Sequence, residues 1–227
     1  MLKHRYLHDF IHKDLQKKMI LLAGPRQVGK TTLAQGLSKN NEYLNFDIDD
    51  DRKAILKKEW DRRKDLLILD ELHKMNRWKQ WLKGVYDKDK LKIPILVTGS
   101  ARMDTLRKVG DSLAGRHFNF RLHPLDLKEL KGIGSSKDNY ERLIAYSGFP
   151  EPFFENSKAF YNRWKRSHTD LILRQDLFSL ELVKDVSSFE TMLLMLQSRV
   201  GSPLSANSIA IDLHKDPKTI QNWLRIA

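Results

Sequence analysis

The sequence predicts an α/β fold in which helices cover both faces of a mostly parallel sheet of five strands, with a helical region after it. Up to residue 125, five short apolar segments alternate with segments of helix length, as right-handed β-α-β units do. Three of these segments are almost entirely apolar, which is typical of strands covered on both faces. After Pro124 the apolar residues follow a helical period instead.

The predicted elements of the first half follow in a regular order. Strands are expected at Met19–Ala23, Tyr43–Asp47, Leu66–Asp70, Ile93–Thr98 and Phe118–Leu122. Helical segments are expected between them, such as Thr31–Lys39 and Asn76–Tyr86. Pro94 has no N–H to donate to a neighbouring strand, so its own strand should begin there or have a free edge.

The second half is expected to be mostly helical. Leu125–Leu130 has helical character, and Gly132–Asn139 should be a loop. Helices are then expected over Ala159–Leu182, which is mostly amphipathic, and over Ser188–Val200, before a break at Gly201–Pro203.

A helix-turn-helix is predicted in the last segment. Ser205 is a suitable N-cap for a short helix that ends near Leu213. Asp216 caps a second helix with Pro217 in its first turn. The chain ends at Ala227 inside this helix, without a wing, so we expect the protein to continue. The expected domains are a core at 1–125, a helical region at 126–187 and a partial winged-helix-like region at 188–227.

Composition excludes several classes of protein. With no cysteine there is no disulfide, thiol nucleophile or cysteine metal site. No apolar run approaches the roughly 18 residues of a membrane span, and the start of the chain is too polar for a secretory signal. We therefore expect a cytoplasmic protein with no membrane partner.

The positive charge is concentrated in the first half of the chain. Residues 1–125 carry 27 Lys/Arg and 16 Asp/Glu, a net charge of +11, whereas residues 126–227 carry 14 and 13, a net charge of +1. Such a field favours polyanions, whether nucleotide, nucleic acid or anionic membrane, and does not choose among them. Solvated lysine-rich faces are the alternative explanation.

A phosphate-binding loop is predicted directly after the first strand. The segment GPRQVGKT, from Gly24 to Thr31, matches the pattern G-x-x-x-x-G-K-[ST] and precedes a helical segment. Its glycines let successive backbone N–H groups point at phosphate oxygens, and the helix N-terminus adds partial positive charge. Lys30 is expected to reach the β- and γ-phosphates, and the Thr31 hydroxyl to ligate Mg²⁺. The predicted nucleotide-binding residues are Gly24, Pro25, Arg26, Gln27, Val28, Gly29, Lys30, Thr31 and Thr32. A chance or non-binding loop is the alternative.

An acidic pair at the end of the third predicted strand supplies the rest of an ATPase site. Asp70 follows the apolar run LLIL and is expected to hold Mg²⁺, usually through water. Glu71 can polarise a water for in-line attack on the γ-phosphate. An acid directly after the metal-binding aspartate favours an ATPase over a GTPase or a small-molecule kinase. A solvent-facing acidic pair is the alternative.

Hydroxyl side chains end the fourth predicted strand, at Thr98 and Ser100. The carboxyl ends of parallel strands open onto the crevice where ligands bind. Either hydroxyl could therefore bond the γ-phosphate or the attacking water, with Thr98 the better candidate. A turn with capping hydroxyls is the alternative.

Six segments together resemble one family. They are, in chain order, GPRQVGKTTL, LLILDELHK, RWKQWLKGVYD, LVTGSARMD, GDSLAGRHFNFRLHPLDLKEL and YSGFPEP. They resemble prokaryotic AAA-family ATPases of the AAA_14 type with a DUF4143 C-terminal region. The resemblance covers nearly the whole chain and implies a five-stranded AAA-like core that binds ATP and Mg²⁺, followed by a helical and winged-helix region. Members of that family typically continue well beyond the point where this chain ends. The sequence shows no convincing sensor-type arginine on a lid helix.

The resemblance also suggests a role for Arg116. In an AAA-like core, the segment before the Phe118–Leu122 strand lies near the subunit edge, away from its own phosphate loop. Arg116 could there stabilise the γ-phosphate of a neighbouring subunit as an arginine finger, with Arg102 and Arg107 as substitutes. Alternatively, Arg116 pairs with a local acid such as Asp111 and only shapes the loop.

Several other features favour simpler interpretations. His4, His8 and His12 would share one face of a helix, where docking is favoured over zinc binding because no carboxylate pattern supports a metal. Trp78, Trp81 and Leu82 at helical spacing indicate core packing more than a base-stacking platform. The basic segments 52–58, 62–64 and 163–166 fit either a polyanion patch or a solvated helix face.

The leading hypothesis is a Mg²⁺-dependent ATPase whose hydrolysis drives a conformational change in an attached helical and winged-helix module. The alternative is an ATP-gated DNA-binding regulator with little or no turnover. A small-molecule kinase is disfavoured, because Gly132–Asn139 is not an arginine-rich acceptor lid. A homo-oligomer and weak, nonspecific DNA binding are further expectations.

Overall fold

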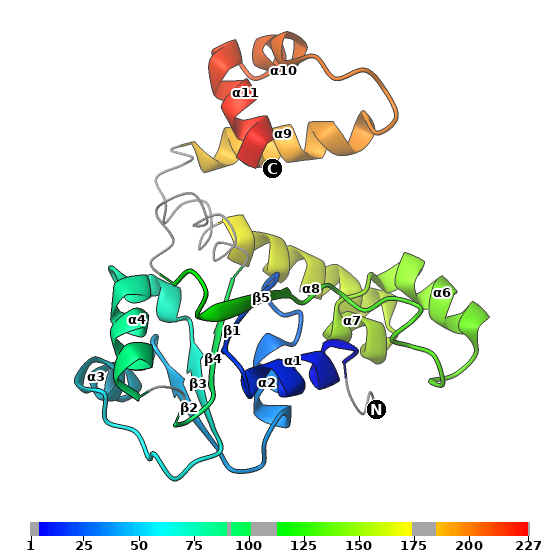
Figure 1. The fold of residues 1–227 in the computed structure, drawn as a ribbon. Helices are drawn as coiled ribbons and strands as arrows, with labels where there is room; N and C mark the ends of the chain where they lie inside the picture. The colour runs from blue at the N-terminus through cyan, green and yellow to red at the C-terminus, as the bar shows by residue number, and fades with distance from the viewer. Residues whose placement is uncertain (1–4, 90–91, 101–112, 174–184, 227) are drawn as a thin grey trace. The chain divides into compact units, whose positions relative to one another are not determined.

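The computed structural model describes residues 5–89, 92–100, 113–173 and 185–226 (Figure 1). The chain divides into two compact units, Met1–Tyr161 and Asn162–Ala227. The first unit contains the sheet and the predicted phosphate loop, and the second is helical.

A sheet of five parallel strands forms the centre of the first unit, in the order β2-β3-β4-β1-β5. The strands are β1 (Met19–Ala23), β2 (Asn41–Asn45), β3 (Leu66–Asp70), β4 (Ile95–Gly99) and β5 (His117–Arg121). The parallel five-stranded sheet is therefore confirmed. The predicted bounds of β1 and β3 are those of the structure, and β4 begins directly after Pro94, as its missing N–H requires. The predicted second strand was placed two residues too late.

Two helical layers cover the sheet because alternate residues of each strand face opposite sides. The helices α1 (Leu7–Leu15) and α2 (Lys30–Gly36) pack on one face, where the cluster includes Ile20, Leu22, Ile68 and Leu96. The helices α3 (Asp49–Lys57) and α4 (Trp78–Asp89) pack on the other face, with Leu21, Leu67, Leu69 and Val97. Figure 1 shows the two layers on either side of the strands. The three central strands β3, β4 and β1 are buried along their whole length.

The segment after the sheet differs from the prediction. Leu125–Leu130 forms turns rather than a helix. Asp126 caps a single turn, in which the Leu130 N–H donates to the Asp126 backbone oxygen at 3.1 Å, and the left-handed conformations of Gly132 and Gly134 keep that turn from continuing. Helix α6 (Ser136–Tyr146) begins inside the stretch predicted as a loop, with the Ser135 hydroxyl accepting from the Asp138 N–H at its N-terminus. A short helix, α7 (Pro150–Glu155), follows, and α8 (Lys158–Leu171) comes next. Residues 174–184 of the long helix predicted there lie outside the described residues.

Three helices make up the described core of the second unit. They are α9 (Val186–Ser198), α10 (Ala206–Asp212) and α11 (Pro217–Ile226). Phe189, Met192, Ile209, Ile220 and Trp223 are buried between them. The predicted caps are confirmed, because Ser205 accepts from the Ser208 N–H at 3.3 Å and Asp216 from the Lys218 N–H at 2.7 Å. The described part of this unit contains no strand, so the expected winged-helix character is not confirmed.

The described helices include none with the length and hydropathy needed to cross a membrane.

Candidate nucleotide-binding site

The predicted phosphate loop joins β1 to α2 and has a backbone shape that requires glycine at both ends. A Cβ on Gly24 would lie 2.5 Å from the backbone oxygen of Leu122, which follows β5. Gly29 has φ of +94°, in the left-handed region that L side chains rarely adopt. The consensus glycines thus let the loop pass close to β5 and turn into α2, as a phosphate-binding loop must.

Lys30 is the first residue of α2 and is almost completely buried, with 8% of its surface exposed. Its Nζ donates to the backbone oxygens of Gly24 at 3.0 Å and Pro25 at 2.7 Å. The loop therefore curls around a buried ammonium group. A phosphate bound in the loop would meet this charge without further desolvation of the lysine.

The Asp70 carboxylate, at the end of β3, is the hydrogen-bonding centre of the site. Its Oδ2 accepts from the hydroxyls of Thr31 at 2.9 Å and Tyr43 at 2.8 Å. Its Oδ1 accepts from the hydroxyl of Thr98 and from the Glu71 N–H at 3.0 Å. With 5% of its surface exposed, Asp70 is held by donors from four different parts of the chain. Its two oxygens and the Thr31 hydroxyl are the hard oxygen donors that suit Mg²⁺.

Tyr43 also belongs to the candidate site, although it was not among the residues predicted from the sequence. It lies on β2, beside β3, in register with Ile68. Burial, and then its hydrogen bond to Asp70, raise the pKa of Tyr43 well above its usual range. The tyrosine therefore remains a neutral donor to the carboxylate. The sequence did place Tyr43 inside a predicted strand. It could not show that this strand lies beside β3, which ends at Asp70, because strand order could not be derived from the sequence.

Glu71 adopts a left-handed backbone conformation, with φ of 56°, which is uncommon for a residue other than glycine. Its N–H donates to the backbone oxygen of Thr98 at 3.0 Å as well as to Asp70. These two bonds hold the residue in this conformation, at the carboxyl end of β3. Such strained residues are often found at functional sites.

The Glu71 side chain is mostly buried beside a cation. Its Oε2 lies 3.4 Å from Lys74 Nζ and 3.7 Å from His73 Nε2, and it accepts no hydrogen bond from any described residue. Burial raises the pKa of the Glu71 carboxyl, and the nearby Lys74 opposes that shift. Lys74 also contacts Asp47 at 2.5 Å. A buried carboxyl with a raised pKa and a spare acceptor oxygen is well suited to take a proton from water.

The two hydroxyls predicted on the fourth strand are both buried. Thr98 is fully buried and bonds Asp70, its register partner on β3. Ser100 is 3% exposed, and its Oγ lies 3.4 Å from His73 Nε2. Thr98 therefore contacts the acidic site directly, whereas Ser100 contacts His73, which in turn lies beside Glu71.

Arg116 lies at the amino ends of the strands, opposite to the carboxyl ends where the phosphate loop lies. It directly precedes β5, whose first residue, His117, is in register with Met19 at the start of β1. The guanidinium of Arg116 binds Asp87 of α4, with Nε to Oδ1 at 2.8 Å. Its acidic partner is thus Asp87, whereas Asp111, Arg102 and Arg107 lie outside the described residues.

The remaining features are mainly structural. Trp78 and Leu82 are buried in the core, and Trp81 packs edge-on against Trp60, so the core interpretation of these residues is confirmed. His8 stacks on His12, His4 lies outside the described residues, and no group of possible metal ligands occurs in the part of the chain that is described. In the basic segments, the cations of three residues pair with neighbouring carboxylates. They are Arg52, Lys53 and Arg63.

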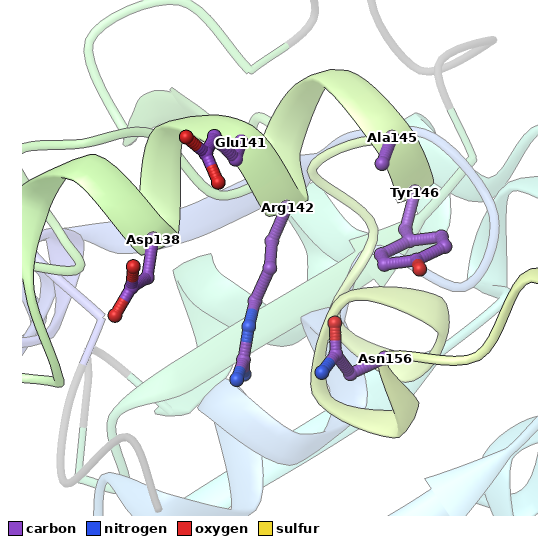
Figure 2. A pocket seen from close by; sticks show the side chains of 6 residues that line it. All are labelled: Asp138, Glu141, Arg142, Ala145, Tyr146 and Asn156. Atoms are coloured by element: carbon purple, nitrogen blue, oxygen red, sulfur yellow. The ribbon is translucent and has the colours of Figure 1, made fainter.

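A surface pocket of about 360 Å³ lies between α6 and Asn156, the residue that follows α7. It is lined by Asp138, Glu141, Arg142, Ala145, Tyr146 and Asn156. Figure 2 shows the Arg142 side chain extending from α6 between Asp138 and Asn156. None of these residues belongs to the phosphate loop or to β3, so the pocket is separate from the nucleotide site.

Comparisons with known proteins bear on both parts of the chain. The AAA domain model of the AAA_14 family matches residues 16–131. A domain of unknown function, DUF8612, matches residues 137–227. The expected DUF4143 region was therefore wrong. Of the six segments that carried that resemblance, only YSGFPEP lies beyond residue 131, so the C-terminal part had little sequence support.

Two similar relatives are uncharacterized mycobacterial proteins, Mb2031c of Mycobacterium bovis and Rv2008c of Mycobacterium tuberculosis. Each is 27% identical over 210 residues, which cover 91% of this chain and 46% of the relative. The chain thus spans about half the length of these relatives. Among solved structures, a variant of RuvB from Thermotoga maritima has a TM-score of 0.46 and 20% identity, covering 93% of this chain and 80% of that one.

Proposed function

The chain belongs to the AAA_14 family of AAA domains, and from this premise we propose that it binds ATP with Mg²⁺ and hydrolyses ATP to ADP and phosphate. The observation that carries the proposal is the hydrogen bond between Thr31 of the loop and Asp70 of β3, with Glu71 directly beside it. This contact joins the phosphate loop to the carboxylate for which we propose metal binding, at the carboxyl ends of the strands, where ligands of parallel sheets bind.

Each residue of the site has a separate role in this proposal. The backbone of residues 24–32 surrounds the phosphates, and Lys30 neutralises the β- and γ-phosphate oxygens. Thr31 and Asp70 would hold Mg²⁺, which supplies charge neutralisation on the same oxygens. Tyr43 and Thr98 keep the Asp70 carboxylate in place through their hydroxyls.

Glu71 is the proposed general base. Its buried Oε2 would accept the proton of the attacking water, and its raised pKa increases its affinity for that proton. Thr98, on the neighbouring strand β4, would orient the water or the γ-phosphate once Asp70 engages the metal. We further propose that Arg116 acts on the γ-phosphate of a neighbouring copy, which requires a homo-oligomer.

The purpose of hydrolysis in this proposal is to move the helical unit that follows. The domain of unknown function that matches residues 137–227 follows the AAA domain and includes this helical unit. The hydrolysis cycle would change the conformation of the segment that joins the two parts.

Calorimetric titration with ATP and Mg²⁺ tests nucleotide binding, and phosphate release tests turnover. Lys30→Ala should abolish binding, because the loop loses the charge that faces the β- and γ-phosphates. Lys53→Ala is the matched control, because it removes one lysine charge from a surface pair with Asp50. Equal ATP affinity in Lys30→Ala and the wild type would refute the assignment of the site.

The alternative function, an ATP-gated DNA-binding regulator with little or no turnover, has one structural observation in its favour. On α11, the exposed residues Lys218, Gln221, Asn222 and Arg225 are spaced so that they share one face. These are side-chain types that contact phosphates and base edges in DNA complexes. The buried face of the same helix carries Ile220 and Trp223.

Salt-dependent DNA binding distinguishes this alternative from the ATPase. Residues 185–226 carry four Lys/Arg and four Asp/Glu, so we expect weak, nonspecific binding whose logarithm falls linearly with the logarithm of salt concentration. Arg225→Ala should lower the magnitude of that slope by about one if the α11 face contacts phosphate. Phosphate release that is rapid without DNA would favour the ATPase.

A further inference from the structure

Arg5, just before α1, makes contacts that join three distant parts of the first unit. Its Nε and Nη2 donate to the two carboxylate oxygens of Glu129 at 2.8 and 2.9 Å. Its Nη1 donates to the backbone oxygen of Val28 in the phosphate loop at 2.9 Å, and Nη2 donates to the backbone oxygen of His123 at 2.5 Å. The side chains of Arg5 and Glu129 are 9% and 0% exposed.

The contact between Arg5 and Glu129 is more than a surface ion pair. Burying both charges is costly unless good geometry and further hydrogen bonds compensate. The parallel fork geometry of the guanidinium provides this, and Glu129 also accepts from the Tyr6 N–H at 3.0 Å. A lysine could not make the same four bonds, because its ammonium donates from a single point.

The bond to Val28 fixes a peptide group of the phosphate loop. In a trans peptide the C=O of one residue and the N–H of the next point in opposite directions. With its oxygen held by Arg5, the Val28–Gly29 peptide must direct the Gly29 N–H away from Arg5. Gly29 immediately precedes Lys30, so this N–H is one of those that a loop of this kind offers to phosphate.

Arg5 also bonds the segment that passes close to the other end of the same loop. His123, whose oxygen it bonds, follows Leu122, and the Leu122 oxygen closely approaches Gly24. Arg5 Nη1 and Pro150 Cγ are the two atoms nearest to a Cβ built on Gly29, at 3.7 and 3.9 Å. The loop is therefore approached at Gly29 by Arg5 and by the first residue of α7.

We propose that Arg5, held by Glu129, is a positioning residue that keeps the empty phosphate loop in its nucleotide-binding shape. The inference rests on the proposed function, because it assigns a role within the same site. Arg5 acts through the backbone of Val28, whereas Lys30 and Thr31 act on the ligand directly. It also gives the N-terminal segment a role in nucleotide affinity.

The test measures ATP affinity and the Michaelis parameters of Arg5→Met, which keeps the apolar stem of the side chain. Without Arg5 the loop adopts its binding shape less often, and the apparent Kd rises in proportion to the lost population. We expect the Kd and KM for ATP to rise about 10- to 100-fold, the range that a hydrogen bond to a charged group is worth. At saturating ATP, kcat should change by less than about threefold, because binding then orders the loop.

Two variants separate positioning from a general loss of stability or charge. Arg5→Lys keeps the charge, and we expect it to restore less than half of the lost affinity on a logarithmic scale. Arg63→Met removes another arginine that binds an aspartate through two nitrogens, at the exposed pair with Asp61, and should leave ATP affinity unchanged. Thermal unfolding of each variant reports the folded fraction, which affects the number of sites but not KM.

The outcomes distinguish this inference from the function on which it rests. Wild-type protein that binds no ATP would overturn both. Wild-type binding with an unchanged Kd in folded Arg5→Met would overturn only the role of Arg5. Full rescue by Arg5→Lys would also overturn it, because a point charge would then suffice. A fall in kcat with an unchanged KM would likewise contradict positioning of the empty loop.

Discussion

Replacing Glu71 by glutamine should separate ATP binding from hydrolysis. Glutamine has nearly the same shape as glutamate but cannot take a proton from the attacking water. Loss of a general base lowers a rate by roughly 10²- to 10⁴-fold. This corresponds to about 2.7–5.5 kcal/mol in the activation barrier. We therefore expect steady-state phosphate release to fall by at least about 10²-fold while ATP binds as in the wild type.

The structure predicts that this loss is not caused by unfolding. The Glu71 carboxylate is mostly buried and accepts no hydrogen bond at Oε2 from the described residues, so glutamine breaks no such bond there. Lys74, which lies 3.4 Å from Oε2, keeps its second contact with Asp47. A partly exposed ion pair of this kind is worth about 0–1 kcal/mol. The melting temperature should therefore change little.

Phosphate release at saturating ATP and calorimetric ATP binding are the two assays for Glu71→Gln. Glu59→Gln is the control, because it makes the same substitution at an exposed position after α3. Turnover at the wild-type rate in Glu71→Gln would refute the reasoning, since another group would then activate the water. Loss of ATP binding would show instead that Glu71 contributes to the nucleotide site itself.

The remaining predictions concern pH, metal and subunit contacts. Burial raises the pKa of the Glu71 carboxyl above its usual 4.5. As the pH falls, Glu71 should therefore become protonated, and phosphate release should be lost, at a higher pH than for an ordinary carboxyl. A fall of kcat/KM in acid with its midpoint at or below 4.5 would contradict this. Asp70→Asn should weaken ATP binding more in the presence of Mg²⁺ than in its absence. Calorimetry with Mg²⁺ and with EDTA measures both affinities, and an equal loss of affinity under the two conditions would contradict the prediction. Arg116→Ala should bind ATP normally and hydrolyse it about 10³- to 10⁵-fold more slowly. Mixing it with Lys30→Ala should restore some phosphate release, whereas a monomer that turns over at full rate would eliminate action between subunits.

Much of the first unit could be predicted from the sequence because its signals are local. The strands β1 and β3 are apolar runs that are buried on both faces, so composition alone identified them. The strand β2 was misplaced because it is polar and half-buried, and its burial comes from its neighbours rather than from its own apolar residues. The helix predicted at Leu125–Leu130 was wrong because only one capped turn forms there, and the left-handed conformations of Gly132 and Gly134 end it.

The candidate site shows the same limit. The loop residues and Asp70 follow from spacing along the chain, but Tyr43 and Arg5 do not. Tyr43 reaches Asp70 across two neighbouring strands, and Arg5 meets Glu129 at a separation of 124 residues. Contacts of this range depend on strand order and on the path of the terminal segment. The sequence specifies both only through the fold as a whole.

The parallel sheet also restricts how Arg116 could take part in the reaction. The phosphate loop follows the end of β1, whereas Arg116 precedes the start of the neighbouring strand β5. The two strands are parallel and in register, from Met19 beside His117 to Ala23 beside Arg121. Each strand has five residues, so its two ends lie about 13 Å apart at a rise of about 3.3 Å per residue. Arg116 is therefore badly placed to serve its own phosphate loop. Its pair with Asp87 is partly exposed, and such pairs stabilise a protein weakly, so a neighbouring copy that offered a γ-phosphate could displace Asp87. Oligomerisation and hydrolysis would then depend on the same side chain, which is why the mixed-subunit experiment tests both.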